Sequence, residues 1–182
     1  MPRKRRPART GIVYQINVSP GGVPKRPIAE GVITPGGVLG DRQADLRAHG
    51  GPRRAVCLYP LELIEALAAE GHDVIPGHFG ENITTSGLNW RLVLPGCRLR
   101  LGDDVLLEIT EYTTPCWKQA QWFTDGDFSR LSAANHPGQA RVYAKVIDSG
   151  TIAPGAKIEL LEDSLDDRLE RQRIPTIRWT PS

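Results

Sequence analysis

The chain has 182 residues, of which 40% are hydrophobic and 24% are charged, and its formal net charge is +2. A chain of this length fits one domain and buries roughly 70% of its unfolded surface on folding. The near balance of charge argues against a protein whose whole surface attracts nucleic acid, so nucleic acid is not an expected partner. The 19 glycines and 15 prolines, with few long helical patterns, favour short strands joined by tight turns.

The cysteines and the N-terminal residues bear on the compartment. The chain has three cysteines, Cys57, Cys97 and Cys116, which match neither a disulfide framework nor a zinc motif. No stretch approaches the roughly 20 apolar residues of a membrane span, so no membrane partner is expected. Residues 1–10 are basic but lack the apolar run of a signal peptide. We therefore expect a cytoplasmic protein in which residues 1–10 form a flexible basic tail, with a nucleic-acid-binding arm as the alternative for that tail.

The pattern of apolar residues predicts mostly strands. Strands are expected within residues 11–19, 29–34, 36–41, 54–59, 89–110, 140–148 and 156–161, with residues 149–155 separating the last two. One helix is predicted over residues 60–71, because Pro60 suits a first helical turn and Gly71 suits a C-terminal cap. Its apolar stripe is formed by Leu61, Ile64, Leu67 and Ala68.

These elements indicate the fold class and the domain organisation. At least seven strands at short spacing, with a few short helices, predict a mainly β fold, a closed or nearly closed β-barrel of about seven strands. The barrel domain would span residues 11–161, and residues 162–182 would form a charged C-terminal helix or tail.

Four turn-like segments combine glycine with polar or charged residues: residues 21–25, 40–54, 78–85 and 112–116. In a barrel, such loops can converge at one mouth and form a ligand site. Their arginines, Arg42, Arg47, Arg53 and Arg54, could bind anionic groups through paired N–H donors. Asn82 can both donate and accept hydrogen bonds, as the edge of a heterocycle requires. Ordinary turn chemistry with solvated arginines is the alternative for any one segment, and the spacing of His72 and His78 matches no metal motif.

Five pieces of the chain, in this order, resemble the MOSC domain, the module named for the C-terminal part of molybdenum cofactor sulfurase. They are GGVPK, GDR followed by HGGPRRAVCLYP, GENITTSGLNW, TTPCWK and RVYAKVIDSGTIAPGAKIEL. The resemblance runs from about residue 11 to residue 161. The chain is similar to the stand-alone bacterial members of the family, which reduce N-hydroxylated bases. It implies a β-barrel that holds molybdopterin-bound molybdenum, with one cysteine sulfur as a metal ligand. By its position in TTPC, that cysteine is Cys116.

The resemblance also implies a set of cofactor contacts, which are Lys25, Asp41, Arg42, His49, Gly50, Gly51, Arg53, Glu81, Asn82 and Thr113. A thiolate is the form of cysteine that binds metal, and a soft sulfur ligand suits a sulfur-rich molybdenum site. The alternative for Cys116 is a buried structural thiol, and the alternative for Lys25 is an ammonium that caps a turn. Cys57 and Cys97 lie outside the ligand motif and are predicted to be structural.

Two features near these motifs depart from the family pattern. Lys145 stands in RVYAKV, where the resemblance leads us to expect arginine, and lysine lacks the planar fork that binds anions in pairs. Trp117 and Trp122 follow Cys116 closely, and they either border the pocket and stack on a flat substrate or lie in the core.

The resemblance implies an enzyme, a molybdenum-dependent reductase of N-hydroxylated compounds such as hydroxylaminopurines and amidoximes. Its electrons would come from a separate reductase protein, and a homodimer is left open. The alternative is a sulfur-carrier or cofactor-binding module in which Cys116 holds a persulfide without substrate turnover. A third reading is a barrel that has lost the cofactor site, for which Lys145 is the only hint.

Overall fold

The computed structural model describes residues 9–42 and 50–161. Its strands are β1 (Thr10–Val18), β2 (Arg26–Ile28), β3 (Gly31–Thr34), β4 (Gly37–Val38), β5 (Val56–Pro60), β6 (Ile83–Ser86), β7 (Arg98–Leu101), β8 (Val105–Tyr112), β9 (Val142–Asp148), β10 (Gly150–Ile152) and β11 (Lys157–Leu160). The α-helix is α2 (Leu61–Ala69), and the 3-10 helices are η1 (Pro52–Arg54), η2 (Trp90–Leu92), η3 (Trp117–Trp122) and η4 (Phe128–Leu131).

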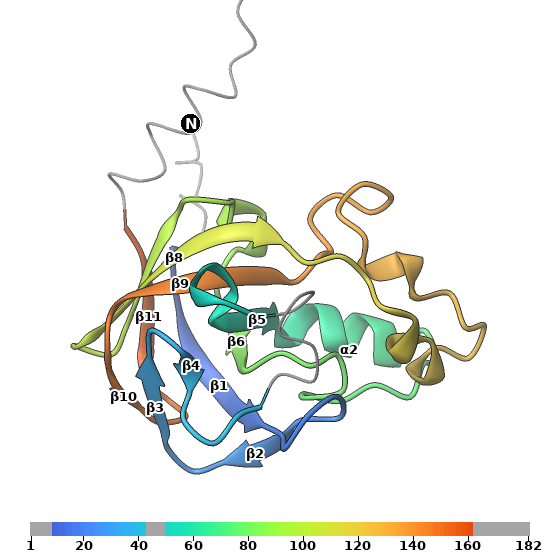
Figure 1. Cartoon of the computed structure of the whole chain (residues 1–182). Coiled ribbons are helices and arrows are strands. Elements are labelled where there is room, and N and C mark those ends of the chain that lie inside the picture. Colours follow the sequence, from blue (N-terminus) through green and yellow to red (C-terminus); the bar gives the residue numbers. More distant parts are fainter. Residues whose placement is uncertain (1–8, 43–49, 162–182) are drawn as a thin grey trace, which may run out of the picture.

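Seven strands close into a barrel in the order β1, β11, β7, β8, β9, β5 and β6, with β6 pairing back onto β1 (Figure 1). The β5–β6 pair is parallel and the other pairs of the barrel are antiparallel, so the sheet is mixed. Strand β1 closes the barrel because its first residues, Thr10–Ile12, pair with β11 while its middle pairs with β6. β2 adds to the far end of β1, and β3, β4 and β10 form a separate small sheet. The predicted fold class is confirmed.

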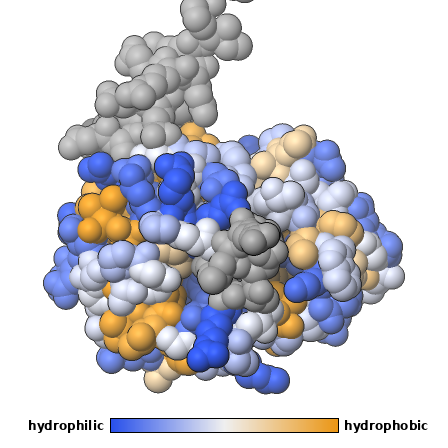
Figure 2. All heavy atoms as spheres, in the orientation of Figure 1, coloured by the Kyte–Doolittle hydropathy of each residue, from blue (hydrophilic) through white to orange (hydrophobic). Residues whose placement is uncertain are grey.

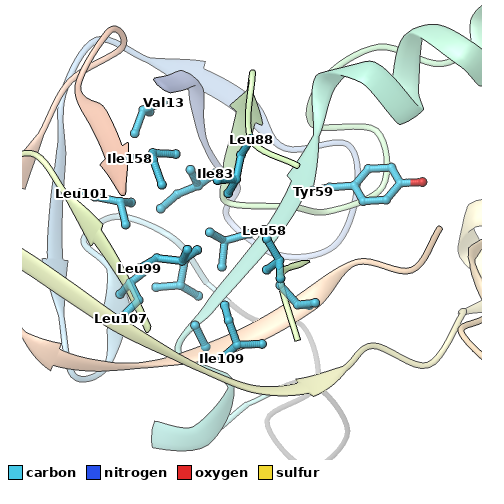
Figure 3. Close-up of a cluster of buried hydrophobic side chains, with 14 of the residues drawn as sticks. Val13, Leu58, Tyr59, Ile83, Leu88, Leu99, Leu101, Leu107, Ile109 and Ile158 are labelled. Atoms are coloured by element: carbon cyan, nitrogen blue, oxygen red, sulfur yellow. The ribbon is translucent and has the colours of Figure 1, made fainter. Parts of the chain in front are cut away.

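Alternation along the strands fills the barrel with aliphatic side chains. Leu58, Ile83, Leu99, Leu107 and Ile109 are fully buried, and Figure 3 shows them facing one another. Because neighbouring side chains of a strand point to opposite faces, the residue next to Leu58 must leave this interior. Tyr59 does so, and its ring points away from the cluster (Figure 3).

A second apolar layer covers the outside of β5. The Tyr59 ring meets Phe79 edge-on at 5.7 Å and Trp90 at 6.4 Å between ring centroids. Helix α2 packs over β5 and β6 and buries Ile64 and Leu67. In Figure 1, α2 and the segment between β8 and β9 lie on the same side of the barrel. This layer gives the outer face of β5 a dry environment in which polar groups need partners.

The predicted helix is confirmed, with small differences at its ends. Pro60 is the last residue of β5 and the N-cap of α2, in an extended conformation, rather than part of the first turn. Gly71 follows the C-cap with a φ of 97°, a conformation that favours glycine. Ala68 is exposed, so the buried stripe is narrower than predicted.

Parts of two strand predictions are wrong. The apolar run of residues 90–94 begins as helix η2, because the Asn89 side chain accepts a hydrogen bond from the Arg91 backbone N–H at 3.2 Å and caps the turn. Residues 150–152, predicted to separate two strands, themselves form β10 and pair with β3. The predicted tail of residues 1–10 and the predicted C-terminal helix or tail of residues 162–182 lie almost wholly outside the described residues.

The surface has no single apolar face in the view of Figure 2, where hydrophobic residues form separate patches among hydrophilic ones. Across residues 9–42 and 50–161, no helix combines the length and the apolar character that a membrane crossing requires.

Candidate functional site

A pocket of about 650 Å³, part of it open to solvent, brings together segments that are distant in the sequence. It is lined by Gly22, Val23, Lys25, Asp41, Arg42, Cys57, Phe79, Gly80, Asn82, Cys116, Lys118, Gln119, Arg141 and Tyr143. All four turn-like segments singled out from the sequence contribute to it. The loops were expected to meet at a mouth of the barrel, but the pocket does not open there. Its lining residues Cys57 and Tyr143 alternate with core residues of β5 and β9, so they point out of the barrel. It lies against the outer face of those two strands.

Asp41 anchors one side of the pocket. The Lys25 Nζ lies 2.5 Å from both carboxylate oxygens, and the two side chains are only 9% and 6% exposed. The Ser19 backbone N–H donates to Oδ1 at 2.8 Å, and the Asn82 Nδ2 donates to Oδ2 at 2.9 Å. The carboxylate therefore accepts from several donors and balances the Lys25 charge inside the pocket wall.

Asn82 joins this group to the sheet. Its Oδ1 accepts from the Cys57 backbone N–H at 3.1 Å, while its Nδ2 donates to Asp41 and to the Asn17 carbonyl. Both N–H donors of the amide are used within the protein. The expected hydrogen bonds from Asn82 to a heterocycle edge therefore find no free donor, and the residue acts as a structural tie at the pocket wall.

Gly77 allows the next loop to approach Lys25 closely. Its φ is 93°, and a Cβ at this position would overlap the Lys25 carbonyl oxygen. The Lys25 backbone N–H donates to the Gly77 carbonyl at 2.9 Å. This contact places residues 79–82 beside Lys25 at the pocket.

Cys116 also lines the pocket, at the point where the chain has left β8 and enters η3. Its backbone N–H donates to the Gln119 Oε1 at 2.9 Å, and the Gln119 Nε2 donates to the Phe79 carbonyl at 3.0 Å. The thiol is partly exposed, whereas Cys57 and Cys97 are buried. Gln119 thus fixes the backbone of Cys116 against the loop that carries Phe79, with the sulfur bordering the pocket.

The floor of the pocket is formed by Cys57, Tyr143 and Arg141. Burial raises the pKa of the Cys57 thiol to about 11, although the nearby Arg141 charge opposes the shift, so this cysteine stays protonated at neutral pH. Burial likewise raises the pKa of Tyr143 to about 12. The Arg141 Nη1 donates to the Phe79 carbonyl at 2.5 Å and lies 3.9 Å from the Cys57 sulfur.

The lining carries an excess of positive charge. Lys25, Arg42, Lys118 and Arg141 are cationic, and among the described residues Asp41 is the single carboxylate of the lining. The formal charge of the described lining is therefore +3 when the thiols are neutral. A pocket with this balance attracts anionic ligands.

The predicted site residues divide into three groups. Lys25, Asp41, Arg42, Asn82 and Cys116 line the pocket. Glu81 and Thr113 are buried next to lining residues but do not line it themselves. Gly50, Gly51 and the exposed Arg53 are not among the lining residues, and His49 lies outside the described residues.

The Glu81 carboxyl group is hydrogen-bonded within the protein, next to the start of β6. Its Oε1 accepts from the Gly77 backbone N–H at 2.5 Å and from the Thr84 hydroxyl at 3.0 Å, while its Oε2 has no hydrogen-bond partner. Burial raises the pKa of this carboxyl, and the hydrogen bonds to Gly77 and Thr84 oppose the shift. Glu81 thus holds the turn that precedes β6 rather than facing the pocket.

The two departures from the family pattern are also placed. Lys145 pairs with Glu108 at 2.9 Å and is not among the lining residues, so the cation that this stretch brings to the pocket is Arg141. Trp117 is 72% exposed and does not lie in the core. Trp122 packs against the core and stacks on His78 at 3.8 Å between ring centroids.

Sequence reasoning missed Arg141, Tyr143, Gln119, Lys118 and the pocket-facing position of Cys57. Alternation offered a signal for two of them, because Val142 and Ala144 read as core positions and their neighbours must point outward. Gln119 carried the spacing of a capping residue three positions after Cys116, and its side chain accepts a hydrogen bond from the Cys116 backbone N–H.

Comparison with known proteins agrees with this architecture. The MOSC domain model matches residues 45–159. Protein YiiM of Escherichia coli (strain K12) is 32% identical over 153 residues, which make up 81% of this chain and 66% of that protein. Its crystal structure superposes with a TM-score of 0.63 and 26% identity, covering 84% of this chain and 70% of that chain.

Two further relatives align over much of this chain. The uncharacterized protein YflK of Bacillus subtilis (strain 168) is 35% identical over 145 residues, covering 77% of this chain and 63% of YflK. A protein of Gibberella moniliformis (strain M3125 / FGSC 7600) named Reductase is 37% identical over 133 residues, covering 69% of this chain and 23% of that protein. The chain thus spans less than two thirds of YflK and of YiiM. From the family match, the shared fold and these relatives, this chain belongs to the MOSC domain family.

Proposed function

We propose that this protein is a molybdenum-cofactor-dependent reductase that converts N-hydroxylated compounds, such as hydroxylaminopurines and amidoximes, to amines. The observation that carries the proposal is Cys116, a partly exposed thiol at the wall of a pocket whose lining has a formal charge of +3. Family membership and the fungal relative named Reductase agree with a redox role.

The residues present fit the proposed cofactor. A pterin with a phosphate and a dithiolene is anionic, and the cations of the lining outnumber its one carboxylate. The buried Arg141 Nε has no hydrogen-bond partner in the described structure, so the pocket floor retains an unused donor. Cys116 would supply a soft sulfur ligand for molybdenum.

Each group of the pocket would have a distinct task. When bound, the cofactor supplies the two-electron chemistry at the N–O bond. Cys116 would hold the metal, with Gln119 fixing its backbone. The paired Lys25 and Asp41 would shape part of the pocket wall, while the exposed Arg42 and Lys118 would attract and orient anionic groups. Electrons would come from a separate reductase protein.

The test is elemental analysis of the wild type and of Cys116→Ser, both produced in a molybdate-fed host that makes the cofactor, together with fluorescence of the released oxidised pterin. We expect about one molybdenum per chain in the wild type, and loss of the metal with partial retention of pterin in the variant. Cys97→Ser is the matched control, because Cys97 is buried, donates to the Leu92 carbonyl and does not line the pocket.

Reduction of hydroxylaminopurine with an artificial electron donor then tests the activity. The wild type and Cys97→Ser should turn the substrate over, and Cys116→Ser should not. A folded wild type that holds neither molybdenum nor pterin would overturn the proposal. A labile sulfur on Cys116 in such a protein would identify the sulfur-carrier alternative instead.

A further inference from the structure

Arg141 differs from the other cations of the pocket in its surroundings. It lies directly before β9, is 5% exposed and lines the pocket floor. Its Nη1 donates to the Phe79 carbonyl, but its Nε is buried without a hydrogen-bond partner. Among the residues that the structure describes, no carboxylate lies within ion-pair distance of its guanidinium. This buried guanidinium therefore has an Nε–H donor and a positive charge that no described group of the protein satisfies.

The rest of the described structure shows that this is unusual. Lys25 is paired with Asp41 inside the same pocket. Arg54 holds Glu111 through two nitrogens, and Arg130 holds Glu70 in the same way. Desolvating a cation without a partner is unfavourable, so buried charges in proteins are normally paired or bound to a ligand.

Nearby carboxylates do not remove this imbalance. Asp41 already accepts from Lys25, Ser19 and Asn82. Glu81 uses one oxygen for Gly77 and Thr84 and makes no ion pair with Arg141, although the Arg141 charge lowers the pKa that burial raises. The pocket itself is the direction from which an anion can reach Arg141.

We propose that Arg141 forms an oxyanion subsite at the floor of the pocket, which takes the phosphate group of a bound ligand. The planar fork of a guanidinium matches two phosphate oxygens, and Phe79 holds the group in place through Nη1. Arg42 and Lys118 add positive charge to the same pocket. The phosphate belongs either to a pterin cofactor, a source that rests on the function proposed above, or to a phosphorylated substrate.

The test uses inorganic phosphate as the probe. The full-length protein is produced in a host that lacks the pterin pathway and titrated calorimetrically with phosphate, against chloride at equal ionic strength. Wild type, Arg141→Met, Arg141→Lys and Lys145→Met are compared. Lys145→Met is the control because Lys145 lies four residues further along, within β9, but pairs with Glu108 and does not line the pocket. Arg98 also contacts Glu108.

We expect Arg141→Met to weaken phosphate binding by about tenfold or more, as for the loss of a charge-assisted hydrogen bond. Arg141→Lys should weaken it less, and Lys145→Met should match the wild type. Equal phosphate affinity in wild type and Arg141→Met would overturn the proposal, as would a wild type that binds phosphate no better than chloride. If near-ultraviolet circular dichroism shows that Arg141→Met is unfolded, Arg141→Lys decides: unchanged affinity overturns the subsite and reduced affinity supports it.

A second arm identifies the source of the phosphate. The same titration is carried out on protein purified from a host that makes the pterin cofactor. Loss of phosphate binding in the pterin-loaded protein assigns the subsite to the cofactor phosphate, and retained binding assigns it to a separate phosphorylated ligand. If this protein contains no pterin, the function proposed above fails, while the first titration still decides the role of Arg141.

Discussion

The inside of the barrel and the outer face of β5 are made of adjacent residues but have opposite chemistry. Leu58 faces a fully aliphatic interior with Leu107 and Ile109. Its neighbour Cys57 faces a pocket floored by Tyr143 and Arg141. Inside, the side chains need only volume and shape to pack. Outside, buried polar groups depend on specific partners, since each lost hydrogen bond leaves a desolvated group behind.

This difference separates stability from binding. A substitution inside the barrel should lower the free energy of unfolding without changing what the folded molecules bind. A substitution on the outer face should change binding as well, because the same hydrogen bonds shape the pocket and connect its loops to the sheet. The following variants test that division.

Asp41→Asn should have the largest effect. The described groups that hydrogen-bond to the carboxylate are all donors, so an amide nitrogen there faces another donor, and Lys25 keeps an uncompensated charge. Breaking a buried pair costs about 3–5 kcal/mol, to be measured by urea unfolding. Glu111→Gln makes the same change at the partly exposed Arg54 pair and should cost less than about 1 kcal/mol. Similar losses for both variants would contradict the distinction.

Leu107→Ala probes the interior. Leu107 is fully buried, so the change should lower the free energy of unfolding by about 2–5 kcal/mol. The pterin content per folded molecule should equal that of the wild type, because no pocket residue is altered. A loss of pterin from folded Leu107→Ala protein would show that the two regions are not separable.

Gln119→Leu probes the support of Cys116. It removes the acceptor of the Cys116 backbone N–H and one of the two donors to the Phe79 carbonyl. We expect a stability loss of about 1–2 kcal/mol and a larger fractional loss of molybdenum than of pterin. Gln121→Leu is the control, since Gln121 is exposed and bonds only its own turn through the Lys118 carbonyl. Metal loss no greater in Gln119→Leu than in the control would rule out this supporting role.

Glu81→Gln should have the smallest effect, and one that depends on pH. Burial raises the folded pKa of Glu81 above its ordinary value of 4.5, so the native state binds the proton more tightly than the unfolded state. The unfolding free energy of the wild type should therefore fall as pH rises from about 4.5 through the folded pKa. The glutamine keeps an oxygen for Gly77 and Thr84 and has no charge to bury. Its stability relative to the wild type should increase over this pH range in urea titrations, and a difference that is constant with pH would refute the assignment.

The barrel could be predicted from the sequence because apolar and polar residues alternate along a strand that has one buried face. The stretch that forms β8 carries that signal, whereas the stretch that forms β5 is a continuous apolar run that is buried throughout. Residues 90–94 carry similar apolar content, but a local Asn89 cap overrides it. Pairing partners, such as the parallel contact of β5 with β6, depend on long-range packing that no short window contains.

The pocket was predictable only in part, through the likeness of its loops to a known family. That likeness located Cys116, Lys25 and Asp41 in one place. It did not show that Asn82 donates both amide N–H groups to Asn17 and Asp41, because hydrogen bonds within the fold can be read only from the structure. Alternation did not single out Arg141, because Arg141 and Lys145 lie four residues apart and so project to the same side of an extended stretch. Spacing alone therefore cannot say which of the two cations borders the pocket.

The pairing of β1 with β11 has a consequence for how the protein is made. Residues 10–12 lie beside residues 157–159 in the closed barrel, so β1, which is synthesised before the other described strands, finds one of its partners only after β11, the last of them, has emerged. Contacts so distant in the chain slow folding, because a long loop must be ordered before they form. Until then, the edges of β1 and β7 that β11 will cover remain open, and this interval is when a nascent chain needs protection from pairing with its neighbours.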